Sequence, residues 1–171
     1  MMVAGAPLPR GDMSTAQLAR ALGTLDESAK AAVTAAHYEA YRYGSGFLGS
    51  VHLLLGLLAD TGEPMTSSLT RNGAAPEIIR SHFEQVYGAQ SHDPPHVMHL
   101  PYNLHAKAIL INAANCSCGC GTSHTGTDDL WRALADAVGS VATRVLAELG
   151  QLGHVHRGLP ERAKGCRPSQ R

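Results

Sequence analysis

The sequence predicts an all-α fold in which two pseudo-symmetric four-helix repeats pack as one compact domain. The segments 25–58 and 102–134 align without a gap at an offset of 77 residues, and an internal repeat of this kind indicates one supersecondary unit used twice. Apolar residues recur at helical spacing, and no segment alternates convincingly with a period of two. A chain of 171 residues is also long enough to bury a real core.

The first helix of each repeat is predicted from a single apolar stripe. In repeat one the stripe is formed by Ala29, Val33, Ala36, Ala40 and Tyr43. In repeat two it is formed by Ala106, Leu110, Ala113, Ser117 and Cys120. Gly44 and Gly121 follow, where the C-terminus of a helix favours a residue in the left-handed conformation. Both helices are therefore expected to end at these glycines.

The second helix of each repeat is expected to begin at an N-cap. Ser50 and Thr127 are the candidate caps, because a hydroxyl can accept a hydrogen bond from the first turn. A third helix is expected over 64–72 in repeat one and over 141–149 in repeat two. These assignments place the second and third helices of the two copies at equivalent positions.

The fourth helix differs between the repeats. In repeat one it is expected to start at Pro76, with the side chains of Ile79, Phe83 and Val86 turned inward. The counterpart "LGHVHRGL" contains two glycines and is expected to be short. The predicted organisation is an N-terminal extension with a short helix (1–24), a double-repeat domain (25–157) made of repeat one (25–88), a linker (89–101) and repeat two (102–157), and a flexible basic tail (158–171).

Composition excludes several classes of function. The formal net charge is zero, which argues against a protein devoted to nucleic acid. No apolar run reaches the roughly 20 residues that span a bilayer, and the N-terminus lacks the pattern of a signal peptide. We therefore expect a cytoplasmic protein whose cysteines (Cys116, Cys118, Cys120 and Cys166) are reduced. The oligomeric state is left open.

Two segments are distinctive: "GFLGSVHLLLGLL" at 46–58 and "GSVATRVLAELG" at 139–150. They resemble the amino-terminal repeat domain of the Clp ATPases, and the resemblance extends over about residues 25–157. No G-x-x-x-x-G-K-[ST] loop accompanies it, so no ATPase engine is expected. The resemblance implies a non-catalytic binding module whose partners are a Clp ATPase, its adaptors, protein substrates or peptide ligands. A decoy that sequesters a Clp-targeting peptide antibiotic, and so confers resistance, is one form of this hypothesis.

The resemblance also implies two phosphoarginine pockets next to the capping residues Ser50 and Thr127. Carried over to this sequence, the pairs are Val51 with Asp26, and Asp128 with Asn103. A guanidinium favours a bidentate acidic partner, which Val51 cannot supply. The second pair keeps Asp128, although an acidic residue in the first turn of a helix needs no ligand to explain it.

The stretch "NCSCGCGTSH" allows three interpretations. Cys120 could be a small buried hydrophobe, one cysteine could be a reactive thiol, or Cys116, Cys118, Cys120 and His124 could bind zinc as a Cys₃His site. The zinc site requires an extended chain, because in a helix Cys118 points away from its neighbours. It supports an alternative function: a metal-binding or enzymatic protein, for example in secondary metabolism, built on the same fold. No complete set of nucleophile, base and orienting residue can be named.

Two further predictions concern aromatic and imidazole side chains. His37, Tyr38 and Tyr41 gather on one outward stretch of the first helix, and Tyr38 and Tyr41 are candidate ligand-contacting residues. His52, at the start of the second helix, is expected to make a structural hydrogen bond.

Overall fold

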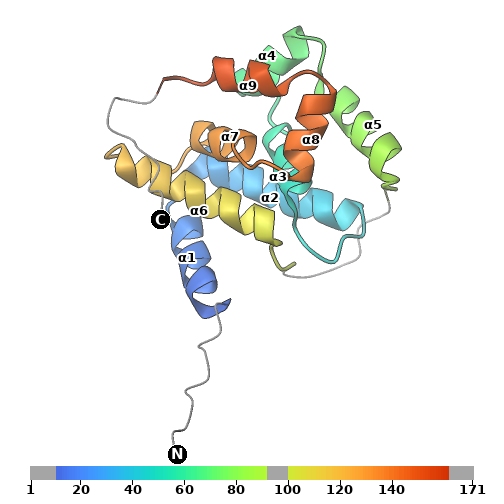
Figure 1. The fold of residues 1–171 in the computed structure, drawn as a ribbon. Helices are drawn as coiled ribbons and strands as arrows, with labels where there is room; N and C mark the ends of the chain where they lie inside the picture. Colours follow the sequence, from blue (N-terminus) through green and yellow to red (C-terminus); the bar gives the residue numbers. More distant parts are fainter. Residues whose placement is uncertain (1–10, 92–99, 162–171) are drawn as a thin grey trace, which may run out of the picture.

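The computed structural model describes residues 11–91 and 100–161, which form nine α-helices (Figure 1). The expectations for residues 1–10, 92–99 and 162–171, including most of the linker and the tail, lie outside the described residues. Repeat one contains α2 (Glu27–Arg42), α3 (Ser50–Leu57), α4 (Pro64–Arg71) and α5 (Pro76–Tyr87). Repeat two contains α6 (Leu104–Gly119), α7 (Thr127–Ala135), α8 (Val141–Glu148) and α9 (Leu152–Gly158). The all-α fold is confirmed, and α1 (Gly11–Gly23) precedes the repeats and packs against α6.

The two repeats keep the same local structure at equivalent positions. Asp26 and Asn103 are the N-caps of α2 and α6, with φ of −73° in both cases. Each side chain accepts a hydrogen bond from the backbone N–H three residues on, at 2.8 and 2.9 Å. Gly44 and Gly121 follow these helices with φ of +59° and +75°, where a side chain would be strained. The predicted helix ends are therefore correct.

The N-caps of α3 and α7 differ from the prediction. The caps are Gly49 and Gly126, so that Ser50 and Thr127 are the first residues inside the helices. Glycine has no side chain that could accept hydrogen bonds from the N–H groups of the first turn. Instead, the side chain of the third helical residue, His52 in α3 and Asp129 in α7, accepts a hydrogen bond from the N–H of the cap. The Ser50 hydroxyl has another partner, since its Oγ accepts the Ala142 N–H of α8 at 3.2 Å.

The two repeats join through crossed contacts. Leu25 forms an isolated parallel β-bridge with Thr125, and Leu48 forms the equivalent bridge with Tyr102. The Asp26 N–H donates to the Thr125 carbonyl at 2.9 Å, and its counterpart Asn103 donates to Leu48 at 2.9 Å. The segment before the first helix of each copy therefore pairs with the segment before the second helix of the other copy, which defines a pseudo-two-fold axis.

The second helices lie at the centre of the domain. Helix α3 contacts α2, α6, α7 and α8, and all eight of its residues are buried. In α7 the only tryptophan, Trp131, is fully buried. In the outer helix α5, Ile79 and Phe83 face inward as expected, but Val86 does not: it is 52% exposed, because it lies on the solvent side of the last turn.

Close packing of α2 against α3 depends on Gly56. A Cβ atom at this position would lie 2.7 Å from the Ala36 nitrogen and closer still to the Ala32 carbonyl oxygen. Both are rigid backbone atoms of α2, so the helices can approach this closely only if residue 56 has no side chain. Repeat two has Ala133 at the equivalent position.

Candidate binding pockets

Each crossed junction brings two helix N-termini together beside a pocket. The acidic pocket, at the N-termini of α2 and α7, has a volume of about 450 Å³. Its lining includes Asp26, Cys116, Cys120, His124, Asp128, Asp129, Arg132, Pro160 and Glu161. The aromatic pocket, at the N-termini of α3 and α6, has a volume of about 320 Å³. Its lining includes Tyr43, Phe47, Ser50, Val51, His52, Phe83, Tyr87, Ala89 and Asn103.

The two residue pairs predicted for the phosphoarginine pockets, Val51 with Asp26 and Asp128 with Asn103, are wrong. Asp26 of repeat one lies with Thr127 and Asp128 of repeat two, whereas Asn103 of repeat two lies with Val51 of repeat one. The physical reason is the crossed bridging of the two copies, which an offset within the sequence cannot reveal. Each pocket therefore contains residues of both repeats.

The acidic pocket contains more acidic than basic groups. Its carboxylates belong to Asp26, Asp128, Asp129 and Glu161, whereas Arg132 is the only arginine or lysine in the lining. The Arg132 guanidinium donates to the Pro160 carbonyl, and Asp129 Oδ2 accepts the Gly126 N–H at 3.0 Å. Asp128 is exposed. Carboxylates at two helix N-termini are favoured by the helix dipoles, and together they make the pocket attractive to a cation.

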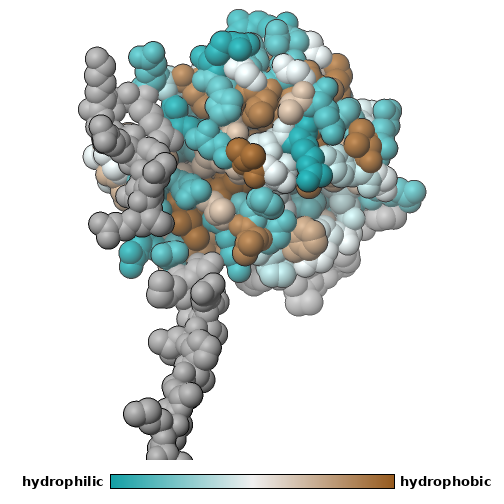
Figure 2. Space-filling model, in the orientation of Figure 1, coloured by the Kyte–Doolittle hydropathy of each residue, from teal (hydrophilic) through white to brown (hydrophobic). Residues whose placement is uncertain are grey.

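The aromatic pocket combines a cluster of aromatic rings with a buried aliphatic residue. Tyr43 and Phe83 meet edge to face with ring centroids 5.3 Å apart, and Phe83 lies 5.6 Å from Tyr87. Val51 is only 5% exposed, whereas Phe47 is 48% exposed at the rim. On the face shown in Figure 2, hydrophobic residues form separate patches among polar ones rather than a continuous band. The aromatic pocket can bury an apolar side chain of a ligand.

His52 makes the predicted structural hydrogen bond. Its Nδ1 accepts the Gly49 N–H at 2.9 Å, so this ring nitrogen carries no proton. Burial lowers the pKa of the His52 imidazole to about 4, although the nearby Glu39 charge acts in the opposite direction. The side chain is therefore neutral near pH 7 and adds no charge to the aromatic pocket.

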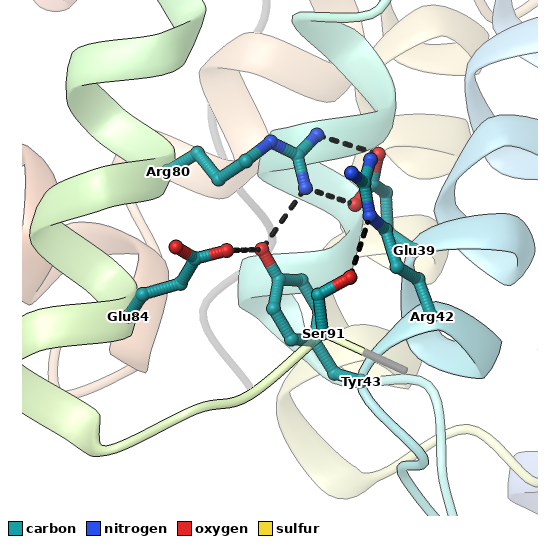
Figure 3. A network of polar contacts seen from close by, with 6 residues as sticks. All are labelled: Glu39, Arg42, Tyr43, Arg80, Glu84 and Ser91. Atoms are coloured by element: carbon teal, nitrogen blue, oxygen red, sulfur yellow. Dashed lines mark hydrogen bonds and ion pairs between the residues drawn. The ribbon is translucent and has the colours of Figure 1, made fainter. Parts of the chain in front are cut away.

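A polar network that sequence reasoning missed holds one wall of the aromatic pocket (Figure 3). Arg80 of α5 donates to both carboxylate oxygens of Glu39 in α2, at 2.6 and 2.7 Å. It also donates to the Tyr43 hydroxyl at 2.9 Å, and that hydroxyl donates to Glu84 at 2.8 Å. Burial, followed by the hydrogen bond to Glu84, raises the pKa of Tyr43. The signal in the sequence was two pairs spaced by four residues, Glu39 with Tyr43 and Arg80 with Glu84.

The cysteine predictions are only partly met. Helix α6 continues to Gly119, so the chain is not extended at Cys116 and Cys118. Cys120 is exposed rather than buried like the other members of its stripe, because it lies beyond the last helical turn. It is disulfide-bonded, whereas Cys116 and Cys118 are not, so the expectation that all cysteines are reduced is wrong for Cys120.

The predicted zinc ligands do not form a metal site within the described part of the chain. Cys116, Cys120 and His124 line the acidic pocket and Cys118 does not. No group of three or more His, Cys, Asp or Glu side chains at residues 11–91 and 100–161 is arranged to hold a metal ion. A disulfide sulfur also lacks the thiolate that zinc binds.

His37, Tyr38 and Tyr41, which were predicted to form one outward patch on α2, differ in their contacts and exposure. His37 Nδ1 lies 2.9 Å from the Val33 carbonyl oxygen, and the His37 ring packs edge-on against Tyr102. Tyr38 is 69% exposed, whereas Tyr41 is half-buried. Neither Tyr38 nor Tyr41 lines the acidic or the aromatic pocket.

These observations define a double-repeat domain with two pseudo-equivalent pockets. A model of the Clp repeat (R) N-terminal domain matches residues 24–149, and the chain therefore belongs to this family. The crystal structure of the N-terminal domain of the caseinolytic protease associated chaperone ClpD from Arabidopsis thaliana superposes with a TM-score of 0.67 at 20% sequence identity. The match covers 81% of this chain and 93% of the ClpD chain. No described helix is long and apolar enough to cross a membrane.

Proposed function

We propose that this protein is a non-catalytic module that binds peptide segments through the acidic and aromatic pockets. The observation that carries the proposal is the pseudo-two-fold axis. It relates two pockets at equivalent places in the fold, one lined by carboxylates and the other by aromatic and aliphatic side chains. Adaptors and substrate proteins offer such segments as exposed, unfolded chain. A free peptide, including an antibiotic directed at a Clp ATPase, belongs to the same class of ligand.

The acidic pocket supports binding of a lysine or arginine side chain. A charged donor forms hydrogen bonds to carboxylates that are about twice as strong as neutral ones. Asp128 is exposed at the start of α7 and lines the same pocket as Asp26. The excess of carboxylates opposes the phosphate of phosphoarginine, so an unmodified side chain is the better ligand.

The aromatic pocket supports binding of an apolar side chain. With Val51 in place of an acidic residue, a guanidinium in this pocket would lose its partner. The rings of Tyr43, Phe83 and Tyr87 provide apolar surface instead. The polar network of Figure 3 fixes Tyr43 in advance, which reduces the entropy lost on binding.

Fluorescence polarisation with a labelled peptide library tests the proposal. Peptides that contain both a cationic and an aromatic residue should bind best. Asp128→Asn should lower the affinity for these peptides about tenfold. Glu77→Gln, a matched change of an exposed acidic residue in the first turn of α5, should leave the affinity unchanged.

For the aromatic pocket, Phe47→Ala should weaken the same peptides, whereas Val138→Ala should not; Val138 is 89% exposed and lies outside both pockets. Absence of binding by any peptide would refute the proposal. Equal affinity for peptides with and without a cationic residue would refute the role of the acidic pocket.

A further inference from the structure

A third pocket lies along α2, outside the two pockets to which the function above is assigned. Its volume is about 550 Å³. Ala31, Ala32 and Ala35 of α2 line it together with Asp60 and Glu63 of the segment between α3 and α4. We call it the alanine groove. The three alanines offer apolar surface without a long side chain that would fill the space.

Repeat two has larger residues at the equivalent positions. At the offset of 77 residues, Ala32 and Ala35 correspond to Ile109 and Asn112. The two copies nevertheless form the same four helices in the same order. The small residues of the alanine groove are therefore a feature of repeat one and not a requirement of the shared fold.

Glu63 lines the alanine groove with a carboxylate that is only partly used. The residue is 7% exposed. Its Oε2 accepts the N–H groups of Met65 and Thr66 at 2.9 and 3.1 Å, which caps α4. Its Oε1 is buried and has no hydrogen-bond partner among the described residues. A buried oxygen without a partner costs free energy, and a ligand that donates a hydrogen bond would recover it.

The equivalent residue of repeat two shows that the helix cap does not need a carboxylate. Glu63 corresponds to Ser140, the N-cap of α8, whose Oγ accepts the Thr143 N–H at 3.3 Å. A serine hydroxyl is one of the favoured capping groups and brings no charge. Glu63 adds a negative charge and a second oxygen at the same place. Capping explains neither of these additions.

The charged residues that line the alanine groove are all acidic. Glu27 and Asp60 line it together with Glu63, and none of the lining residues is a lysine, an arginine or a histidine. Glu27 pairs with Lys30 at 3.1 Å, and Asp60 Oδ1 accepts the Gly62 N–H at 2.9 Å. Within residues 11–91 and 100–161, no three acidic, histidine or cysteine side chains are arranged to hold a metal ion. The groove therefore suits an organic cation rather than a metal.

A lysine side chain has the shape and the charge for this groove. Its methylene stem can lie along Ala31 and Ala35 while its ammonium donates to Oε1 of Glu63. The terminal torsion of a glutamate is broad, so the carboxylate can turn to meet the donor. An arginine fits less well, because its planar guanidinium pairs best with two carboxylate oxygens, and Oε2 already holds the cap.

The alanine groove is continuous with the acidic pocket. Thr127, the first residue of α7, lines both, and the neighbours Asp26 and Glu27 line one each. We propose that the alanine groove binds a lysine side chain of a peptide through Oε1 of Glu63. The proposal deepens the proposed function and rests on it for the peptide, because a chain seated in the acidic pocket can place a nearby residue in the groove.

Backbone amide NMR of the full chain, titrated with lysine blocked at both ends (N-acetyl-lysine-N-methylamide), tests the proposal. The Met65 and Thr66 amides report on the groove, since they donate to Glu63. Their signals should shift saturably with a Kd in roughly the millimolar range, as expected for a ligand of this size. Blocked arginine, and blocked lysine acetylated on its side-chain nitrogen, should bind about tenfold more weakly. Absence of a saturable shift, or equal affinity for the acetylated form, would overturn the proposal.

Two variants locate the site in the same titration. Glu63→Gln keeps an oxygen for the cap and removes the charge, so the affinity for blocked lysine should fall about tenfold, whereas Glu77→Gln should leave it unchanged. Ala31→Leu narrows the groove without touching the cap and should have a similar effect. Ala108→Leu, the same exposed position in repeat two, is its control. If Glu63→Gln fails to fold, Ala31→Leu decides alone, and unchanged affinity in that variant would refute the groove as the site.

The amide signals also separate this proposal from the proposed function. If blocked lysine shifts Gly126 and Asp128 but not Met65 and Thr66, the acidic pocket binds it and the role of the alanine groove is refuted. If it shifts Met65 and Thr66 but no peptide binds in the polarisation assay, the proposed function fails, and the groove remains a lysine site.

Discussion

Replacing Gly56 by alanine tests the packing of α2 against α3. The added Cβ would lie 2.7 Å from the Ala36 nitrogen and 2.9 Å from the Ala36 Cβ, whereas ordinary contacts begin near 3.4 Å. The helices must therefore move apart by roughly 1 Å at the centre of the core. Overpacking of this kind costs about 1–3 kcal/mol, and a clash with rigid backbone belongs at the upper end. Alanine regains about 1 kcal/mol of helix propensity, so the net loss is about 2 kcal/mol.

Urea unfolding followed by Trp131 fluorescence measures this loss, because the only tryptophan is fully buried. For a chain of this length the midpoint of thermal unfolding should fall by about 4–8 °C. Gly46→Ala is the matched control, since a Cβ at that position meets nothing within 4 Å. A Gly56→Ala protein within about 0.5 kcal/mol of wild type would refute the reasoning, because such a change is typical of a surface site.

Three further predictions follow from the buried polar groups and the cysteines. Because the pKa of His52 falls to about 4 on folding, its unfolded form binds a proton more readily, and stability should decline as the pH falls from about 6.5 to 4. The loss is about 3 kcal/mol when complete, and urea titrations of His52→Gln should lack that component of the pH dependence. Tyr43→Phe should cost about 1 kcal/mol in the same assay, since it leaves Glu84 and Arg80 without a shared hydroxyl; no change would show that the network is replaced by water. Elemental analysis of the oxidised protein should find no stoichiometric zinc, and about one zinc per chain, lost in Cys116→Ser, would restore the metal hypothesis.

The sequence was sufficient to predict the elements of the fold. Turn glycines in register at the offset of 77 residues and one apolar stripe per helix indicated where α2 and α6 end. These features are local, and local propensity determines them. The same stripe wrongly placed Cys120 in the core. Cys120 is the stripe position that follows Ser117, and Ser117 is the last one that is buried. Apolar spacing does not reveal where a helix leaves the core.

The candidate site was less predictable because it depends on how the copies dock. A repeat shows that Asp26 and Asn103 are equivalent, but not which copy each one faces. Only the bridges Leu25–Thr125 and Leu48–Tyr102 decide this. The Glu39–Arg80 pair was missed for a similar reason, because its partners lie on helices that the sequence does not show to be neighbours.

The crossed bridges relate the two repeats of this chain in the way that the two subunits of an isologous dimer are related. In a two-fold dimer each copy contributes one half of every shared site, and neither half is complete alone. Here the linker has joined the two copies, so that they are free to diverge while still sharing both sites. Repeat one supplies Asp26 to a pocket whose other carboxylates come from repeat two and the segment after it. A mutation in one repeat can therefore change a pocket that the other repeat also lines, and a half-length chain would retain neither pocket.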